Sequence, residues 1–279
     1  MRFLVHDVGH GHSIHVFTPN GQIIVIDLGC SASFSPLGWL GRHLPQRTID
    51  MLVISHPHGD HIDEIHLLSG FHVRQLWRPA WLTAAEVYAA NQVTDHEKVA
   101  TYLAMDANFN APIAPTEQVG NPVASGGVSV EIFSSQSCGR SNINNHSLVV
   151  AVGYGGFTIL VGGDNEPSSW NCLLEDARFI QVASQAAVFV ASHHGRLSGH
   201  CADLFDIVKP RLCIISDGRE QDTSATNRYS GCAAGYTVRS RSGGPPQLRY
   251  ALTTRNDGYI DINVTFTILG GTTANVSIK

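Results

Sequence analysis

The chain has 279 residues, of which 43% are hydrophobic and 27 are glycine, and its formal net charge is −5. This composition excludes a disordered or fibrous protein and predicts a turn-rich globular enzyme with a sizeable core. The negative charge argues against strong nonspecific attraction to nucleic acid.

The N-terminal segment reads as a series of strands. Apolar, β-branched runs between Gly, Asn and Pro turns predict strands at about 2–5, 13–17, 22–27 and 50–54. The chain enters the first strand directly, without an apolar stretch that leads to a cleavage site, and it has no run of about 18 apolar residues. We therefore expect a cytoplasmic protein without a membrane partner.

A dense group of metal-binding side chains follows the predicted strand at 50–54. His56, His58, Asp60 and His61 place three imidazoles and one carboxylate within six residues. Imidazole and carboxylate suit zinc, with manganese or iron as alternatives, and four such ligands are too many for one open catalytic ion. The loop predicts two metal ions, the first held by His56 and His58 and the second by Asp60 and His61.

Features around this loop support the metal prediction against the alternative of an accidental surface cluster. The loop directly follows the apolar run at 51–54, and Pro57 and Gly59 predict a stiff, sharply bent backbone. Asp27 or Asp7 would accept the second N–H of a ligating imidazole and so orient it.

Beyond the loop, the pattern predicts alternating helices and strands. Residues 62–68 show helical spacing, residues 74–77 a strand, and residues 83–108 a long helix that begins with a Thr83 cap and Glu86. The Pro- and Gly-rich stretch 108–127 predicts a loop, either over the site or as a plain surface connection.

The second half repeats this alternation. Strands are predicted at about 128–133, 147–153, 157–161, 187–191, 211–215 and 259–268, with helices near 167–178 and 199–208. Asp164 follows one strand and two glycines, which favours a metal ligand over a helix cap. His193 and His194 follow the strand at 187–191. One of them would complete the shell of the second metal, and the other would orient a neighbour or act as an acid.

Several motifs in order resemble the metallo-β-lactamase superfamily. They are the His-x-His-x-Asp-His loop at 56–61, Ile26-Asp27-Leu28-Gly29, and Gly162-Gly163-Asp164. Within that superfamily the chain is most similar to the hydrolase domain of the ComEC DNA-uptake proteins, through residues 7–13, 144–149 and 192–195. The resemblance covers about residues 3–262. It implies one α/β domain over 1–279, a four-layer αβ/βα sandwich with mixed sheets, and a bridging position for Asp164.

The resemblance also marks where this chain departs from the family. His10 and His12 stand where Gln and Asp are common, and they lie either near the metals or in a hydrogen-bonded turn. Hydrolytic members often place a further His ligand before the strand near 148, which makes His146 a candidate ligand, whereas ComEC-like members have Asn and Ser there. The final His of a later family motif is missing, which leaves Arg228 or Tyr229 as candidate substrate contacts.

The cationic residues are unevenly distributed. Residues 196–255 contain nine Arg and Lys against five Asp and Glu, a local balance of +4. This segment is either an ordinary solvated surface or a basic wall beside the metals that suits an anionic substrate such as a nucleic acid or a small phosphodiester. Six cysteines form no Cys-x-x-Cys pair, so we expect mostly buried thiols.

Together these observations predict a metal-dependent hydrolase that uses a metal-bridged hydroxide, with Asp60, His193 and His194 as the catalytic residues. Phosphodiesters are the leading substrate class, as in a nuclease or phosphodiesterase. One alternative is a hydrolase of carboxylic esters, lactones or amides; another is a metal-stabilised binding protein without turnover. No Gly-x-Ser-x-Gly elbow supports a serine mechanism. The oligomeric state and native substrate stay open.

Overall fold

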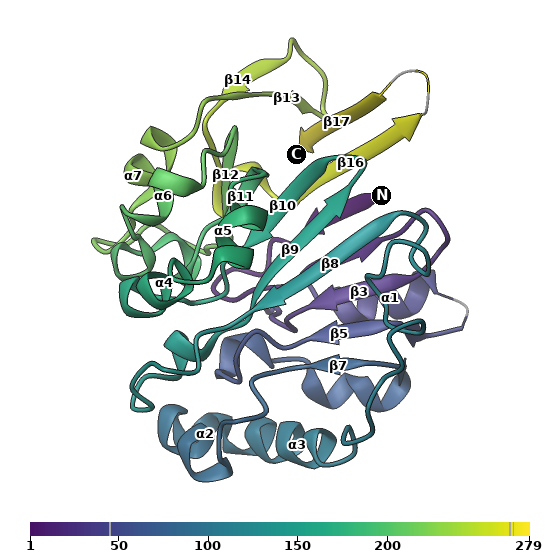
Figure 1. The fold of residues 1–279 in the computed structure, drawn as a ribbon, viewed down its shortest axis with the longest axis vertical. Coiled ribbons are helices and arrows are strands. Elements are labelled where there is room, and N and C mark those ends of the chain that lie inside the picture. Colours follow the sequence, from purple (N-terminus) through teal and green to yellow (C-terminus); the bar gives the residue numbers. More distant parts are fainter. Residues whose placement is uncertain (45, 268, 270) are drawn as a thin grey trace.

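Two β-sheets pack face to face, and helices cover the outer face of each sheet (Figure 1). The computed structural model describes residues 1–44, 46–267, 269 and 271–279. The predicted α/β four-layer sandwich with mixed sheets is confirmed. β3 (Ile23–Ile26) shows how the sequence produces it, because Ile24 and Ile26 enter the core between the sheets while Ile23 and Val25 pack under helices on the other side.

The larger sheet joins the two ends of the chain. β1 pairs antiparallel with β16 near the C-terminus, whereas β3, β5 and β7 are parallel neighbours. In spatial order, the described strands of this sheet are β14 (Gln247–Arg249), β13 (Tyr236–Ser240), β17 (Gly271–Ile278), β16 (Ile260–Thr267), β1 (Arg2–Val5), β2 (Ile14–Phe17), β3, β5 (Met51–Val53) and β7 (Leu76–Trp77).

The smaller sheet contains four consecutive parallel strands, from β10 to β15. In spatial order its described strands are β15 (Ala251–Thr253), β12 (Leu212–Ile215), β11 (Ala186–Val190), β10 (Phe157–Val161), β9 (Val149–Tyr154) and β8 (Val128–Phe133), and a separate short pair consists of β4 (Thr48–Ile49) and β6 (His72–Val73). Because parallel strands end at a common edge, the loops that follow β10 and β11 leave the sheet side by side.

The helices divide between the two outer faces. The larger sheet is covered by α1 (Pro36–His43), η2 (Ile65–Gly70), α2 (Ala84–Ala90) and α3 (His96–Asp106). The smaller sheet is covered by α4 (Pro167–Leu173), α5 (Ala177–Ala183), α6 (Leu204–Ile207) and α7 (Thr226–Gly231). The remaining described helical turns are η1 (Gly59–His61), η3 (Val93–Asp95), η4 (Ile143–His146), η5 (His193–Gly195), η6 (Leu197–Gly199) and α8 (Thr254–Asp257).

Two predicted long helices are each divided. The helix expected at 83–108 begins with the predicted capping box of Thr83 and Glu86 but ends at Ala90, because the Asn91 side chain donates to the carbonyls of Val87 and Pro57. The helix expected at 167–178 ends at Leu173, and Asp176 then caps α5. The helical spacing at 62–68 forms the 3₁₀ turn η2, and only Leu204–Ile207 of the segment 199–208 is α-helical.

The strand predictions were more accurate than the helix predictions. Where a predicted strand end differs from the structure, the error is one or two residues. Residue 268, the end of the strand expected at 259–268, lies outside the described residues. The sequence prediction missed the helices α1, α7 and α8, the short strands β4, β6, β13, β14 and β15, and the C-terminal strand β17. In the described part of the chain, every helix is too short or too polar to cross a membrane.

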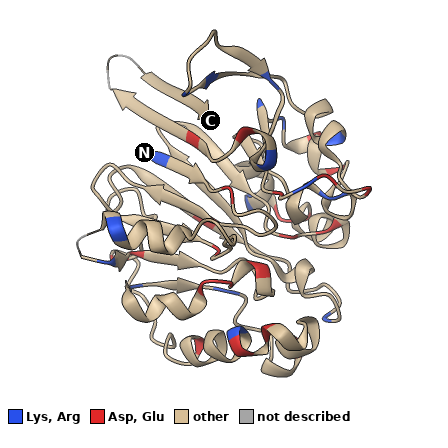
Figure 2. Ribbon diagram, turned by 180° about the vertical axis from the view of Figure 1, so that it is seen from behind, with Lys and Arg blue, Asp and Glu red and all other residues tan. Residues whose placement is uncertain are grey.

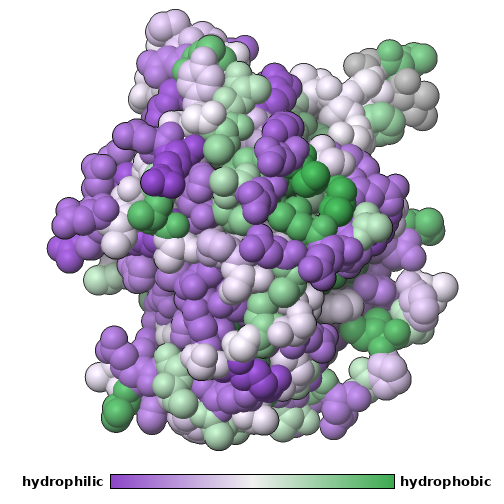
Figure 3. Space-filling model, turned by 60° about the vertical axis from the view of Figure 1, so that its left-hand side comes forward, coloured by the Kyte–Doolittle hydropathy of each residue, from purple (hydrophilic) through white to green (hydrophobic). Residues whose placement is uncertain are grey.

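The surface is mixed in character. Acidic and basic residues are interspersed along the ribbon and do not separate into two halves (Figure 2). On the face seen in Figure 3, hydrophilic side chains predominate and hydrophobic ones gather in small groups. Part of the positive charge of the segment 196–255 is internally paired, since Arg196 and Arg255 both bind Asp217.

Candidate metal centre

The candidate ligands converge from the ends of three strands. His56 to His61 follow β5, Asp164 follows β10, and His193 and His194 follow β11. His61, Asp164 and His56 offer ligand atoms that all lie within 4.8 Å of one another, as do His10, Asp60 and His194. The sequence prediction that distant segments meet at one centre agrees with this geometry.

The backbone is strained at this edge of the sheets. Asp27, His193 and His194 have positive φ angles of 60°, 49° and 52°, which residues other than glycine rarely adopt. Gly163, which precedes Asp164, has a φ of 55°, and a Cβ there would lie 2.9 Å from the Cβ of Ser147. Gly163 is therefore the glycine of this motif that the close approach of Asp164 requires.

Asp27 organises the loop after β5. It is fully buried and accepts hydrogen bonds from the backbone N and the Oγ of Ser55 at 2.6 and 2.7 Å. Nδ1 of His12 and Nδ1 of His61 both donate to its Oδ2 at 2.9 Å. Because these Nδ1 atoms carry the protons, the Nε2 lone pair of His61 is directed to the centre, which is the orienting role predicted for Asp27. Asp7, the other acid considered, is exposed.

One half of the centre contains His56, His58 and Asp164. Nε2 of His56 lies 2.9 Å from Nδ1 of His58 and 4.0 Å from Oδ2 of Asp164. His56 is fully buried, and burial holds the pKa of its ring well below the usual value, so the ring stays neutral and can offer a lone pair. These three residues could hold an ion and leave further positions open.

The other half contains Asp60, His61, His194 and the same Asp164. Nε2 of His194 lies 3.0 Å from Asp60 and 3.4 Å from Asp164, while Nε2 of His61 lies 3.3 Å from Asp164. Nδ1 of His194 donates to the carbonyl of Ser216 at 3.1 Å, which directs Nε2 to the carboxylates. Asp164 therefore stands between both sets of imidazoles.

The charges of the centre fit a cation. Burial opposes protonation of His194, yet Asp164 and Asp60 raise its pKa to about 10. Burial likewise opposes protonation of His61, but Asp164 and Asp27 raise its pKa well above the usual value. Protons on these two rings neutralise the carboxylates, and a divalent ion that replaced them would supply the same positive charge.

Unpartnered nitrogen atoms give a second test of fit. Nε2 of His61 and Nε2 of His194 are buried and make no hydrogen bond among the residues described, although carboxylate oxygens are near. Buried polar atoms normally have a partner, and imidazole and carboxylate are the ligands of zinc and its neighbours. The residues present therefore fit a bound divalent metal.

The two histidines that depart from the family pattern have different surroundings. The side chain of His10 is 59% exposed, and its ring packs at a tilt of 50° against His194 with centroids 4.5 Å apart. Its Nε2 lies 3.5 Å from Oδ2 of Asp60. His12 is buried and donates to Asp27. His10 thus adds a nitrogen beside the Asp60 half of the centre, whereas His12 supports Asp27.

His193 and His194 take different positions despite being adjacent. His194 is buried among the carboxylates. His193 is 26% exposed, its Nδ1 lies 3.0 Å from the Ser198 hydroxyl and 3.5 Å from Glu166, and its Nε2 lies 4.0 Å from Asp164. The geometry therefore favours His194 as the ligand and places His193 at the rim, where an acid would stand.

His146 lies near this edge but in none of the three close groups of potential ligands among the described residues. The indole N–H of Trp81 donates to its Nδ1 at 3.1 Å. Because an indole can only donate, Nδ1 is the acceptor and the proton of a neutral ring is on Nε2, which then has no free lone pair. This arrangement does not favour His146 as a ligand, and its metal role stays a prediction.

The structure requires a glycine at position 59 for a different reason from the one predicted. Its φ is not positive, so the loop does not depend on a left-handed turn there. Instead, a Cβ at Gly59 would lie 2.6 Å from the carboxylate of Asp95. The glycine allows η3 and α3 to approach the metal loop closely. Similarly, Asp164 does not cap α4, whose N-cap residue is Glu166.

A pocket of about 570 Å³ opens beside the centre. Its wall includes His10, Arg196, Arg219, Gln221 and Thr223. Since His10 also belongs to the group with Asp60 and His194, the pocket borders the candidate metal residues directly. Arg196 is held by Asp217 at 3.1 Å and by the Ser224 hydroxyl at 3.1 Å.

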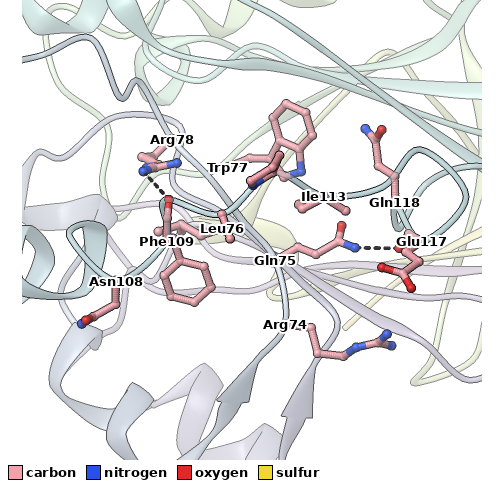
Figure 4. A pocket seen from close by; sticks show the side chains of 12 residues that line it. Arg74, Gln75, Leu76, Trp77, Arg78, Asn108, Phe109, Ile113, Glu117 and Gln118 are labelled. Atoms are coloured by element: carbon pink, nitrogen blue, oxygen red, sulfur yellow. Dashed lines mark hydrogen bonds between the residues drawn. The ribbon is translucent and has the colours of Figure 1, made fainter.

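A second hollow of about 600 Å³ lies elsewhere, against β7 (Figure 4). The loop predicted at 108–127 forms part of its wall, and its lining includes Arg74, Trp77 and Phe109 but none of the candidate ligands. Gln75 holds the loop there by donating to the carbonyl of Glu117. This placement favours a surface connection over a substrate lid.

No known protein-family profile and no curated protein matches the chain. Its structural neighbours are metallo-β-lactamase fold proteins. YhfI from Bacillus subtilis is 12% identical with a TM-score of 0.44, over 84% of this chain and 94% of that one. Zinc-bound PqqB from Methylobacterium extorquens is 13% identical with a TM-score of 0.43, over 78% and 89%. A diphosphatase of the PhnP family is 14% identical with a TM-score of 0.41, over 78% and 87%. This likeness concerns the fold and gives no evidence about substrate.

The sequence reading missed some residues of the site and misjudged others. Tyr229, a predicted substrate contact, is fully buried and its hydroxyl donates to the carbonyl of Ser192, so it supports the loop from behind. Arg228 is exposed but does not line the pocket. Arg196 does line it, and its position directly after His193-His194-Gly195 was the available signal.

Proposed function

We propose that the chain is a metal-dependent hydrolase of phosphodiesters. The observation that carries the proposal is the pocket beside the His10, Asp60 and His194 group, whose lining holds two guanidinium groups, Arg196 and Arg219, and one carboxylate, Asp217. Guanidinium groups bind the anionic oxygens of a phosphate more strongly than they bind neutral acceptor groups. The motifs that resemble ComEC proteins support a nucleic acid strand as one candidate substrate.

We assign two metal positions to the centre. His56, His58 and Asp164 would hold the first ion, and Asp60, His61, His194 and Asp164 the second, with His10 as a further donor to the second. Zinc is the first choice, because imidazole nitrogens dominate the set. When bound, such ions supply water activation near neutral pH and polarisation of the scissile group.

The protein residues would perform the remaining tasks. Asp27 fixes the His61 ring through Nδ1, so the Nε2 atom keeps one direction during the reaction. Arg196, held by Asp217, would orient a phosphate oxygen of the substrate. His193 would hold a proton at Nε2 for the leaving group, since its ring is partly exposed at the rim and its Nδ1 contacts Ser198 and Glu166.

The test compares zinc- and manganese-loaded protein on single-stranded DNA, double-stranded DNA, a small chromogenic phosphodiester and a chromogenic carboxylic ester. Asp60→Asn should lower phosphodiester cleavage by more than about 100-fold, because it removes a charged ligand. Asp203→Asn, at the exposed acid that precedes α6 as its N-cap residue, is the matched control and should leave the rate unchanged. Absence of metal-dependent phosphodiester cleavage would sink the proposal.

Substrate preference gives a second measurement. Arg219→Ala should raise KM for the phosphodiester about tenfold, because a hydrogen bond between charged groups is lost, with little effect on a neutral ester. Arg228→Ala is the control, since Arg228 is exposed outside the pocket. Cleavage of esters alone would instead favour the ester, lactone or amide alternative, and bound metal without any turnover would favour a binding protein.

A further inference from the structure

Two cysteines that are distant in sequence have their sulfur atoms in contact. Cys138 lies in the segment between β8 and η4, Cys172 lies on α4, and their Sγ atoms are 3.8 Å apart. Both residues are half-buried and therefore reachable by small reagents, unlike the buried Cys201 and Cys213. The expectation of mostly buried thiols was wrong, since Cys30, Cys138, Cys172 and Cys232 are all half-buried.

The backbone around the pair permits the sulfurs to come closer. A disulfide requires an S–S separation of about 2.05 Å, so the Sγ atoms must approach by a further distance of less than about 2 Å. Cys138 belongs to a bend outside any helix or strand, whereas Cys172 is held on α4. A bend can move by this amount without breaking a strand or a helix.

The two thiols have unequal chemistry. Hydrogen bonds from the hydroxyls of Ser137 and Ser135 lower the pKa of Cys172, while the Ser135 hydroxyl also lies 3.2 Å from Sγ of Cys138. Burial raises the pKa of Cys138. The thiolate is the reactive form of cysteine, so Cys172 is suited to attack an oxidant and Cys138 to resolve the product.

We propose that Cys138 and Cys172 are an oxidation site that forms a reversible disulfide with hydrogen peroxide. The Cys172 thiolate attacks one peroxide oxygen, the O–O bond breaks, and the leaving hydroxide takes a proton to become water. The sulfur of Cys138 then attacks the resulting sulfenic acid, the S–O bond breaks, and the released hydroxide takes the Cys138 proton. Two thiols lose two electrons in total, and peroxide is reduced to two waters.

This bond would join two segments that together hold the rim of the centre. The Asn142 and Asn144 side chains donate to the carboxylate of Glu166 at 3.1 and 3.3 Å, and Glu166 contacts His193. Asn142 and Asn144 follow Cys138 in the chain, and Glu166 precedes α4, which carries Cys172. The disulfide would therefore fix the distance between the two segments that meet at Glu166.

The test uses the full chain, treated with hydrogen peroxide, alkylated, and digested with trypsin without reductant. Cleavage after Lys98, Arg140 and Arg178 gives peptides 99–140 and 141–178, and each of them contains a single cysteine. We expect these two peptides to appear joined, with the loss of two hydrogen atoms in mass, and to separate after dithiothreitol. The number of titratable thiols should fall from the six of the reduced chain by two.

Single variants separate the proposed pair from random oxidation. Cys138→Ser and Cys172→Ser should each abolish the joined peptide, and Cys138→Ser should leave a sulfenic acid on Cys172 that dimedone traps. Cys30→Ser, at another half-buried cysteine, should form the joined peptide as fully as the native chain. The proposal is overturned if the native chain yields no joined peptide, or if Cys172 pairs with a different cysteine.

Discussion

At the scale of single residues, Asp27 controls the direction of two imidazoles. Its Oδ2 accepts from Nδ1 of both His12 and His61, and its Oδ1 accepts from the Ser55 backbone. Burial disfavours its ionised form, but His61 and His12 hold its pKa below the usual range, so the carboxylate stays charged. A neutral group of the same shape cannot accept all of these hydrogen bonds.

We therefore expect Asp27→Asn to weaken zinc binding about 10–100-fold, the usual effect of removing an orienting carboxylate behind a ligating histidine. Competition with a chromogenic chelator measures the affinity. Asp50→Asn is the control, since Asp50 is also buried but pairs with Arg74 and the backbone of Ile23. Equal zinc affinity in Asp27→Asn and the native protein would contradict the orienting role.

His6 provides a pH-dependent effect away from the metal centre. It is buried, and Nε2 lies 3.0 Å from Nδ1 of the buried His15. Burial, and to a smaller extent Arg2, lowers its pKa from 6.5 to about 4. Above pH 6.5 the ring is neutral in both states. Between 6.5 and 4 it is protonated only when unfolded, so the free energy of unfolding falls as the pH falls, and the loss is complete below 4.

The expected loss from His6 is about 3 kcal/mol across this pH window. Urea unfolding at pH 7.5, 5.5 and 4 measures it as the difference between the native protein and His6→Gln, whose stability should depend less on pH. His72→Gln, at an exposed histidine, should follow the native curve. A His6→Gln curve parallel to the native one would show that this ring does not titrate as described.

At the scale of elements, the edge strand β7 is short, and the side chain of Gln75 beside it forms hydrogen bonds to the neighbouring loop in place of a further strand. Gln75 is buried, donates to the carbonyl of Glu117 and accepts from the backbone N of Val119, which binds the loop to the sheet edge (Figure 4). The backbone of Gln75 also accepts from Leu52. One side chain thus takes the place of a further strand and protects the edge.

Gln75→Ala should lower the free energy of unfolding by about 1–3 kcal/mol, because two polar groups of the loop lose their partner. The change is measured by urea unfolding, with Gln118→Ala as the control, since Gln118 lines the same hollow. Stability equal to that of the control would mean that water replaces the Gln75 contacts without cost.

At the scale of the whole molecule, the metal centre joins the two sheets. His61 follows β5 of the larger sheet, whereas Asp164 and His194 follow β10 and β11 of the smaller one. A bound ion would link both sheets at their common edge, so its removal should affect the stability of the whole fold. The single domain over 1–279 stays a prediction, which the β1–β16 pairing favours.

Removing metal with a chelator should lower the melting temperature, and zinc should restore it. At a free zinc concentration 100 times Kd, the expected stabilisation is about 2.7 kcal/mol. Differential scanning calorimetry gives the change, and Asp60→Asn should show a smaller one because it lacks a ligand. If chelator and zinc leave the melting temperature of the native chain unchanged, the centre does not bind metal tightly.

The amino-acid sequence alone determined those features whose signals are local. The apolar run before His56 predicts β5, the β-branched runs predict most other strands, and the spacing of His56, His58, Asp60 and His61 predicts the metal loop. Local patterns failed where tertiary contacts decide. Asn91 ends a helix by binding the carbonyl of Pro57, which no helical periodicity indicates.

Only the tertiary structure decided which side chains meet. It placed Trp81 on Nδ1 of His146, His10 beside Asp60, and Cys138 against Cys172, which is 34 positions away. It also showed that Gly59 is needed for the approach of Asp95. The physical reason is that a strand or helix pattern indicates only which face of that one element is buried. These contacts instead arise where loops from separate strands converge at one edge of two packed sheets.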